Sequence, residues 1–226
     1  MSRKKYQSLR FISHGTRKSE TKELKKAYLI ACEGECTEPY YIRGLVKHQK
    51  TSQKIAAGTR VMIVPHEHSD PFGVLQDLLN VPNREIYDEL WIVIDRDEVE
   101  GIGKGFGGHS QKNFQDCMKE SEKNNVKVAC SNPCFELWIV LHFEYRDTAC
   151  SRIDIQKKAV QKVNTLLPIN LKLKKIDDLK SLKNIYDLLE DKLDTARRNA
   201  EKLKENEVQC QNPYSGMFRL LNSLLQ

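Results

Sequence analysis

The sequence lacks several features that would assign it to a particular class. It has no run of 18 apolar residues, which argues against a membrane-spanning helix. The N-terminus has neither the apolar stretch of a signal peptide nor a lipidation motif. The sequence has no internal repeat and no Walker-type phosphate loop, which argues against repeat architectures and P-loop nucleotide binding. With 226 residues, 30% of them charged and 39% hydrophobic, the composition is typical of a soluble globular protein.

The cysteines are few and odd in number. Seven of them in a chain of this length argue against a disulfide scaffold and favour the reducing cytosol, so we predict a cytoplasmic protein. Two pairs, Cys32 with Cys36 and Cys130 with Cys134, have a spacing compatible with zinc ligands. The alternative is that these cysteines are small buried hydrophobic residues, which is common for free cysteine.

Basic residues are concentrated at the N-terminus. Residues 1–26 contain nine Lys and Arg against two Glu, a balance of +7, whereas the whole chain carries +6. A basic arm of about residues 1–25, partly disordered, fits either polyanion binding or a solubilising tail. If it binds nucleic acid, the predicted contacts are Arg3, Lys4, Lys5, Arg10, Arg17 and Lys18, together with Lys104 in the glycine-rich stretch Gly101–Gly108.

The hydrophobic pattern after the arm predicts alternating strands and helices. Continuous apolar runs predict strands, and amphipathic or capped stretches predict helices. The strands are expected at 26–32, 60–64, 90–94 and 126–130, and the helices at 37–49, from 71 onward, and 110–124. This order predicts an α/β fold with a mostly parallel sheet flanked by helices over residues 26–150.

The remainder of the chain has a helical pattern. Residues 132–143 are too continuously apolar for a surface helix and predict a buried helix, with a strand as the competing interpretation. Helices are expected over 153–166, 176–206 and 217–225. We therefore predict a helical C-terminal region, residues 151–226, packed on the α/β domain; its apolar ridges are compatible with a homodimer.

Acidic residues follow two of the predicted strands directly. Glu33 comes after the first strand, and Asp95 and Asp97 come after the third. Ligands of open α/β sheets bind at the carboxyl ends of the strands, and carboxylates there are suitable ligands for Mg²⁺. The alternative is that these acids are ordinary residues of surface loops. His66 and His68 follow the second strand and could offer a further base or ligand, but ordinary turn composition favours a polar turn before a helix.

Four stretches of the sequence resemble the RloB family, which is related to the AbiLii abortive-infection proteins. The similarity extends over about residues 26–225, and the segment beginning at Ser131 is the most specific of the four. The stretches are Leu29–Tyr41, Asp95–Glu98, Ser131–Phe143 and Asn212–Ser215.

This resemblance implies a fold, a site and an activity. The family looks like a Toprim-type fold, in which a Glu-Gly pair at one strand end and a later Asp-x-Asp bind a metal. By this resemblance Glu33, Asp95 and Asp97 form the catalytic site and bind Mg²⁺ or Mn²⁺, with Glu136 as a further ligand. The implied function is a metal-dependent endonuclease in bacterial anti-phage defence or abortive infection, acting on DNA or RNA, tRNA included.

Two other functions are compatible with the sequence. One is a non-catalytic nucleic-acid-binding or sensing subunit that works with a partner protein of a restriction or defence complex. The other uses the same acidic site to hydrolyse a nucleotide or small phosphate ester. Clustered acids favour an enzyme over a simple binding protein, because without a metal they repel phosphate.

Overall fold

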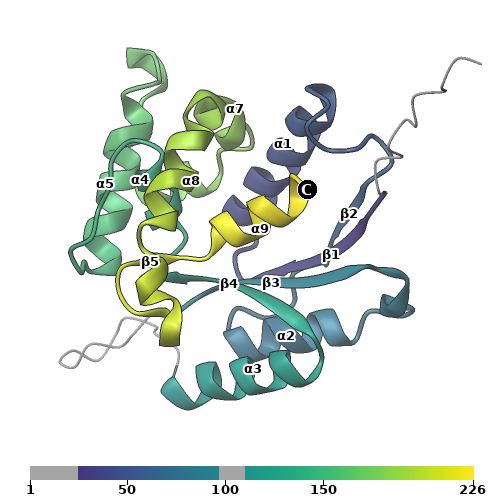
Figure 1. Ribbon diagram of the computed structural model, residues 1–226. Helices are drawn as coiled ribbons and strands as arrows, with labels where there is room; N and C mark the ends of the chain where they lie inside the picture. Colours follow the sequence, from purple (N-terminus) through teal and green to yellow (C-terminus); the bar gives the residue numbers. More distant parts are fainter. Residues whose placement is uncertain (1–24, 97–109) are drawn as a thin grey trace, which may run out of the picture.

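The computed structural model describes residues 25–96 and 110–226 and contains one five-stranded sheet (Figure 1). The spatial order of its strands is β2-β1-β3-β4-β5; the first four run parallel and β5 is antiparallel to β4. The strands are β1 (Ala27–Cys32), β2 (Arg60–Ile63), β3 (Glu89–Asp95), β4 (Val126–Asn132) and β5 (Tyr214–Ser215). The predicted α/β class with a mostly parallel sheet is confirmed.

The exposure of each strand follows its place in the sheet. All six residues of β1 are buried, as are the last five of β3, because both strands have neighbours on each side and helices on both faces. In β2, at the edge, residues alternate between exposed and half-buried. The continuous apolar runs of the sequence therefore identified the central strands to within one or two residues.

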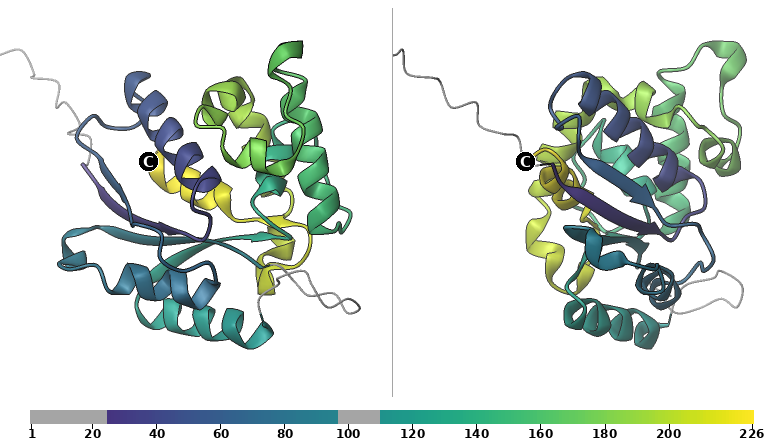
Figure 2. Two further views of the ribbon diagram at one scale, coloured as in Figure 1. Left: turned by 180° about the vertical axis from the view of Figure 1, so that it is seen from behind. Right: turned by 90° about the vertical axis from the view of Figure 1, so that its right-hand side faces the viewer.

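Helices cover both faces of the sheet (Figures 1 and 2). The helices α2 (Pro71–Leu79) and α3 (Gln111–Lys123) lie on one face, and α1 (Thr37–Thr51) lies on the other with the C-terminal helices. Two predicted starts are built as expected: the side chains of Asp70 and Ser110 each accept a hydrogen bond from a backbone N–H in the first turn of the following helix.

The apolar stretch 132–143 forms a buried helix, α4 (Glu136–Leu141), as predicted. All six of its residues are buried. The ring of Trp138 packs edge-on against Tyr41 of α1, and the Tyr41 hydroxyl lies 3.0 Å from Nε2 of His142. Since Nδ1 of His142 donates to the Trp138 carbonyl at 2.8 Å, its Nε2 accepts from Tyr41. Burial lowers the pKa of His142 to about 4, so this ring is neutral and joins α1 to α4.

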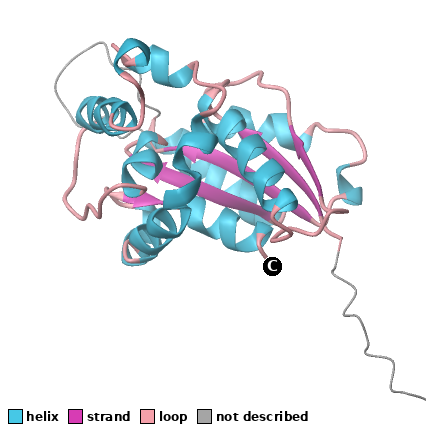
Figure 3. Ribbon diagram, turned by 90° about the horizontal axis from the view of Figure 1, so that it is seen from above, coloured by secondary structure: helices cyan, strands magenta, loops and turns pink. Residues whose placement is uncertain are grey.

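The C-terminal part continues the helical layer above the sheet, and seen from above its helices lie over parts of the strands (Figure 3). The helix predicted at 153–166 is α5 (Arg152–Asn164), and the last predicted helix is α9 (Met217–Leu224). Between them lie short elements: η2 (Ile169–Leu171), α6 (Ile176–Lys180), α7 (Ile185–Leu189), η3 (Glu190–Lys192), α8 (Leu193–Glu201) and η4 (Lys204–Cys210). A further short element, η1 (Arg84–Ile86), precedes β3.

The prediction of one long helix over 176–206 is wrong. The chain leaves the helix at Ser181, whose backbone N–H and hydroxyl both bond to the Asp177 carbonyl, and a new helix begins after Asn184. A serine hydroxyl can offer such a local bond in competition with the helical ladder. Leu179, Ile185 and Leu189 are buried in the core, so the predicted apolar positions are correct although they do not lie on one continuous helix.

The cysteines include one disulfide, which the odd cysteine count did not predict. Cys130 of β4 is bonded to Cys210 at the end of η4. Cys130 therefore cannot belong to the four-thiolate zinc set considered from the sequence. Burial raises the pKa of the Cys32 and Cys134 thiols well above the ordinary value, which disfavours the thiolate that zinc requires.

In the described ranges 25–96 and 110–226, none of the helices has both the length and the apolar character needed to cross a membrane.

Candidate functional site

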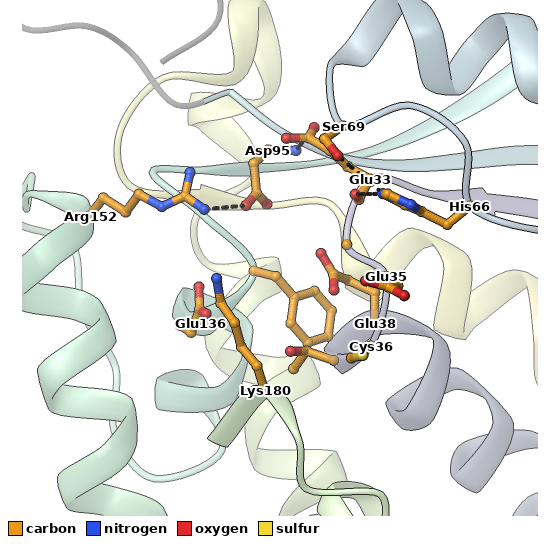
Figure 4. Close-up of a pocket in the computed structure, with 13 residues that line it drawn as sticks. Glu33, Glu35, Cys36, Glu38, His66, Ser69, Asp95, Glu136, Arg152 and Lys180 are labelled. Atoms are coloured by element: carbon orange, nitrogen blue, oxygen red, sulfur yellow. Dashed lines mark hydrogen bonds and ion pairs between the residues drawn. The ribbon is translucent and has the colours of Figure 1, made fainter. Parts of the chain in front are cut away.

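The site lies where the strand order of the sheet reverses. From β1 the chain passes through α1 to β2 on one side, whereas β3 pairs with β1 on the other side. Open α/β sheets bind ligands at such switch points, beyond the carboxyl ends of the strands. Glu33 follows β1 and Asp95 ends β3, so the two acids are brought to adjacent positions. The backbone N–H of Asp95 donates to Oε2 of Glu33 at 2.9 Å, which orients Glu33 beside it (Figure 4).

A pocket of about 380 Å³ opens at this point. Acidic side chains from the turn after β1 and from α1, β3 and α4 line the pocket, and two cationic side chains come from α5 and α6 (Figure 4). The charged residues that line it are Glu33, Glu35, Glu38, Asp95, Glu136, Arg152 and Lys180. Four of these acids are buried, with exposed fractions of 9% for Glu33, 6% for Glu38, 6% for Asp95 and 3% for Glu136.

Three of the residues predicted from the sequence share this pocket: Glu33, Asp95 and Glu136. Their catalytic and metal-binding roles remain predictions. The other predicted residues lie outside the described ranges: Asp97, Lys104, Arg3, Lys4, Lys5, Arg10, Arg17 and Lys18.

Four charged residues of the pocket were not predicted as site residues: Glu35, Glu38, Arg152 and Lys180. Glu38 lies in the first turn of α1, and its place five residues after Glu33 was the available signal, since the chain turns from β1 directly into that helix. Arg152 begins α5 and Lys180 ends α6. Neither has a local sequence signal, because only the tertiary packing of the C-terminal helices brings them to the sheet edge.

The carboxylates interact unfavourably with one another. Burial raises the pKa of Asp95 well above its ordinary value, and the nearby charges of Glu33, Glu38 and Glu136 raise it further. Arg152 offsets part of this effect, with its guanidinium nitrogen 4.0 Å from Oδ2 of Asp95. Burial likewise raises the pKa of Glu38 to about 7, with contributions from Glu136 and Glu33. A cation among these groups would relieve the repulsion.

The donor set fits a hard divalent cation. All the candidate ligands are carboxylate oxygens, which Mg²⁺ and Mn²⁺ prefer. In the described part of the chain, no three of these carboxylates have ligand oxygens within 4.8 Å of one another. Mg²⁺ usually keeps several of its waters and binds through one or two carboxylates, so this spacing suits it better than a fully dehydrated ion.

A second polar group lies near the site and has a structural explanation. Glu67, His68 and Asp77 have potential ligand atoms within 4.8 Å of one another. Asp77 accepts from the backbone N–H of His68 at 3.0 Å and pairs with its Nδ1 at 2.6 Å, which fixes the turn before α2. His66 bonds through Nε2 to the Glu33 carbonyl at 3.0 Å. The turn interpretation therefore accounts for the contacts of His68, whereas His66 reaches across to the residue after β1 and lines the pocket.

Gly34 provides a test of Glu38. A Cβ atom at position 34 would lie 2.0 Å from Oε2 of Glu38, so Gly34→Ala must displace that carboxylate. We expect the affinity for Mn²⁺, measured by calorimetry, to fall on the order of tenfold, the lower end of what loss of a supporting group costs a metal site. The double variant Gly34→Ala/Glu38→Ala should bind no more weakly than Glu38→Ala alone. Additive losses would show that Gly34→Ala acts elsewhere.

The fold and site define an α/β protein with an acidic pocket at the switch point of its sheet. Residues 28–224 match the family described as RloB-like protein, and because this is most of the chain, the protein belongs to the RloB-like family. The resemblance noted in the sequence is thereby confirmed. No curated protein matched the chain, and no solved structure matched it.

Proposed function

We propose that this RloB-like protein is a metal-dependent endonuclease that hydrolyses phosphodiester bonds at the pocket beside Glu33 and Asp95. The observation that carries the proposal is the meeting of these two buried acids, joined by a hydrogen bond, at the switch point of a parallel sheet. The arrangement supports the Toprim-type site that the sequence predicts. The family resemblance supports a role in anti-phage defence or abortive infection.

The pocket residues have complementary roles in this proposal. Glu33, Asp95 and Glu136 would hold Mg²⁺ or Mn²⁺, with Glu38 beside them. When bound, the cation would polarise a phosphoryl oxygen and stabilise the leaving oxygen. The hydrogen bond from the Asp95 backbone keeps Glu33 in position. Arg152 and Lys180 provide the positive charge that a phosphodiester needs in order to approach four buried acids.

The test is incubation of the purified protein with Mg²⁺ or Mn²⁺ and a panel of plasmid DNA, single-stranded DNA, total RNA and tRNA. The expected result is cleavage of at least one substrate, abolished by EDTA and by Glu33→Ala. The member of the panel that is cleaved shows whether the enzyme acts on DNA or on RNA. Binding without cleavage by the folded protein would instead support the non-catalytic subunit. Hydrolysis of small phosphodiesters alone would support the small-ester enzyme.

A further inference from the structure

A second basic segment lies in the C-terminal region. Residues 152–183 contain nine Lys and Arg against three Asp, a balance of +6. The whole chain also carries +6, and residues 1–26 account for +7. The rest of the chain is therefore at −7, so this segment stands out from an otherwise acidic body. It comprises α5, η2 and α6, with the turns that join them and the three residues that follow α6.

Both ends of this segment reach the acidic pocket. Arg152, the first residue of α5, and Lys180, the last residue of α6, are the cationic residues of the pocket wall in the described structure. Between them the chain runs outward along α5, turns at η2 and returns. Figure 4 shows the Arg152 side chain beside Asp95, with which it forms an ion pair, and the Lys180 side chain near Glu136. The segment thus begins at the site and returns to it near its end.

Several lysines of the segment are available to a ligand. Exposed side chains are those of Lys157, Lys172, Lys174, Lys175 and Lys183. By contrast, Lys158 and Lys162 are half-buried and pair with Glu144 at 2.5 and 2.7 Å. Lys175 pairs with Asp177 at 3.1 Å, but both side chains are about two-thirds exposed, so that pair is weak. Most of the exposed charge is therefore not neutralised by the protein.

We propose that the segment 152–183 binds the phosphate backbone of a nucleic acid and guides it to the pocket. The inference rests on the proposed function and specifies its substrate as a polymer. A small phosphate ester could contact Arg152 and Lys180 but would not extend to the lysines outside the pocket. Exposed lysines on one segment attract a polyanion through their charge and through the release of its counterions.

An anionic membrane is the competing ligand, because Ile169 and Leu171 are 89% and 59% exposed at the outer turn. Lysines beside exposed apolar residues also occur on membrane-binding surfaces. Nucleic acid is favoured because the same segment supplies both cations of a pocket that contains four buried acids. Binding to lipid headgroups at a membrane surface would not require cations inside an acidic pocket.

The experiment compares two triple variants of the full-length chain with equal changes in charge. The test variant is Lys157→Glu/Lys174→Glu/Lys183→Glu. The control is Lys47→Glu/Lys54→Glu/Lys119→Glu, which alters exposed lysines on and after α1 and on α3, toward the ends of those helices away from the pocket. Binding of single-stranded DNA and RNA 30-mers is measured by fluorescence anisotropy in EDTA, at several NaCl concentrations.

We expect the test variant to bind at least about tenfold more weakly near 0.1 M salt. The slope of the logarithm of the binding constant against the logarithm of the salt concentration should fall by an amount that corresponds to roughly two phosphate contacts. The control should change affinity less than about threefold, as expected for screened charges at a distance. Equal losses in both variants, no loss in either, or weakened binding to anionic vesicles with unchanged binding to nucleic acid would each overturn the proposal.

A parallel readout separates this proposal from the proposed function. Hydrolysis of bis(p-nitrophenyl) phosphate with Mn²⁺ needs only the pocket, so the test variant should retain it. If the test variant loses binding as expected but even the native protein cleaves no substrate, the nuclease function fails while the binding surface stands. If native protein hydrolyses the ester but binds neither 30-mer, the surface fails while the hydrolytic site stands.

Discussion

Replacing Asp95 by Asn should reduce metal-dependent cleavage by at least about 100-fold, beyond the usual effect of losing an outer-shell partner. Asp95 is one of the two acids that the sheet places side by side. Because it ends a buried strand, a neighbouring carboxylate cannot easily move into its position. Single-turnover cleavage with saturating Mn²⁺ measures the effect. The matched control is Glu122→Gln, an exposed acid of α3, which should leave the rate unchanged.

The same variant should be more stable than the native protein when metal is absent. The pKa of Asp95 is raised in the folded state, so ionisation at neutral pH costs folding free energy that the amide does not pay. We expect a gain of about 1 kcal/mol near pH 7.5 in EDTA, a magnitude common for relief of a strained functional site. Urea denaturation measures it.

The pH dependence gives the sign of this effect. A carboxyl group whose pKa is raised in the folded state destabilises the protein progressively as the pH rises from the pKa of the unfolded state to the pKa of the folded state. Near pH 4, close to the unfolded pKa of an aspartic acid, Asp95 is protonated in the folded protein and the advantage of Asn should disappear. A native protein that is more stable than Asp95→Asn in EDTA at pH 7.5 would contradict the electrostatic description of the pocket.

Trp138→Ala should destabilise the fold by about 3–5 kcal/mol, the range for loss of a large buried aromatic side chain. Trp138 has no exposed surface, and its ring packs edge-on against Tyr41 and His142 at centroid distances of 6.2 and 5.1 Å. Since a whole domain is stable by only about 5–15 kcal/mol, this change threatens folding itself. Guanidinium denaturation of the metal-free protein measures the loss.

Ile169→Ala is the control for this prediction, because its side chain is 89% exposed and should contribute little. If Trp138→Ala does not fold, Trp138→Phe keeps most of the packing and should give an intermediate loss. A loss below about 1 kcal/mol for Trp138→Ala would show that α4 is not held by this cluster.

Much of the α/β core could be predicted because its elements carry strong local signals. The apolar runs of β1 and β3 and the capping residue Asp70, followed by Pro71, act within a few residues of themselves. The two-residue strand β5 could not be found in this way. It exists because the chain returns beside β4, where Ser215 pairs with Ser131, and no pattern of two residues predicts such a pairing.

The site was partly predictable for the same reason. Glu33 and Asp95 end strands, and the parallel order of a sheet brings strand ends together, so their meeting follows from local patterns and a topological rule. Arg152 and Lys180 reach the pocket from helices more than 55 residues further along the chain than Asp95. Their positions depend on how α5 and α6 pack, which composition and periodicity do not specify.

The most direct test of the central claim measures bound Mn²⁺ and cleavage in the same samples. Electron paramagnetic resonance reports the bound ion while a labelled substrate reports hydrolysis, for the native protein and for Glu33→Gln. The account predicts that binding and cleavage rise together as Mn²⁺ is added, and that both are lost in Glu33→Gln while the protein remains folded. Cleavage that persists in Glu33→Gln, or that proceeds with no bound Mn²⁺, would contradict it.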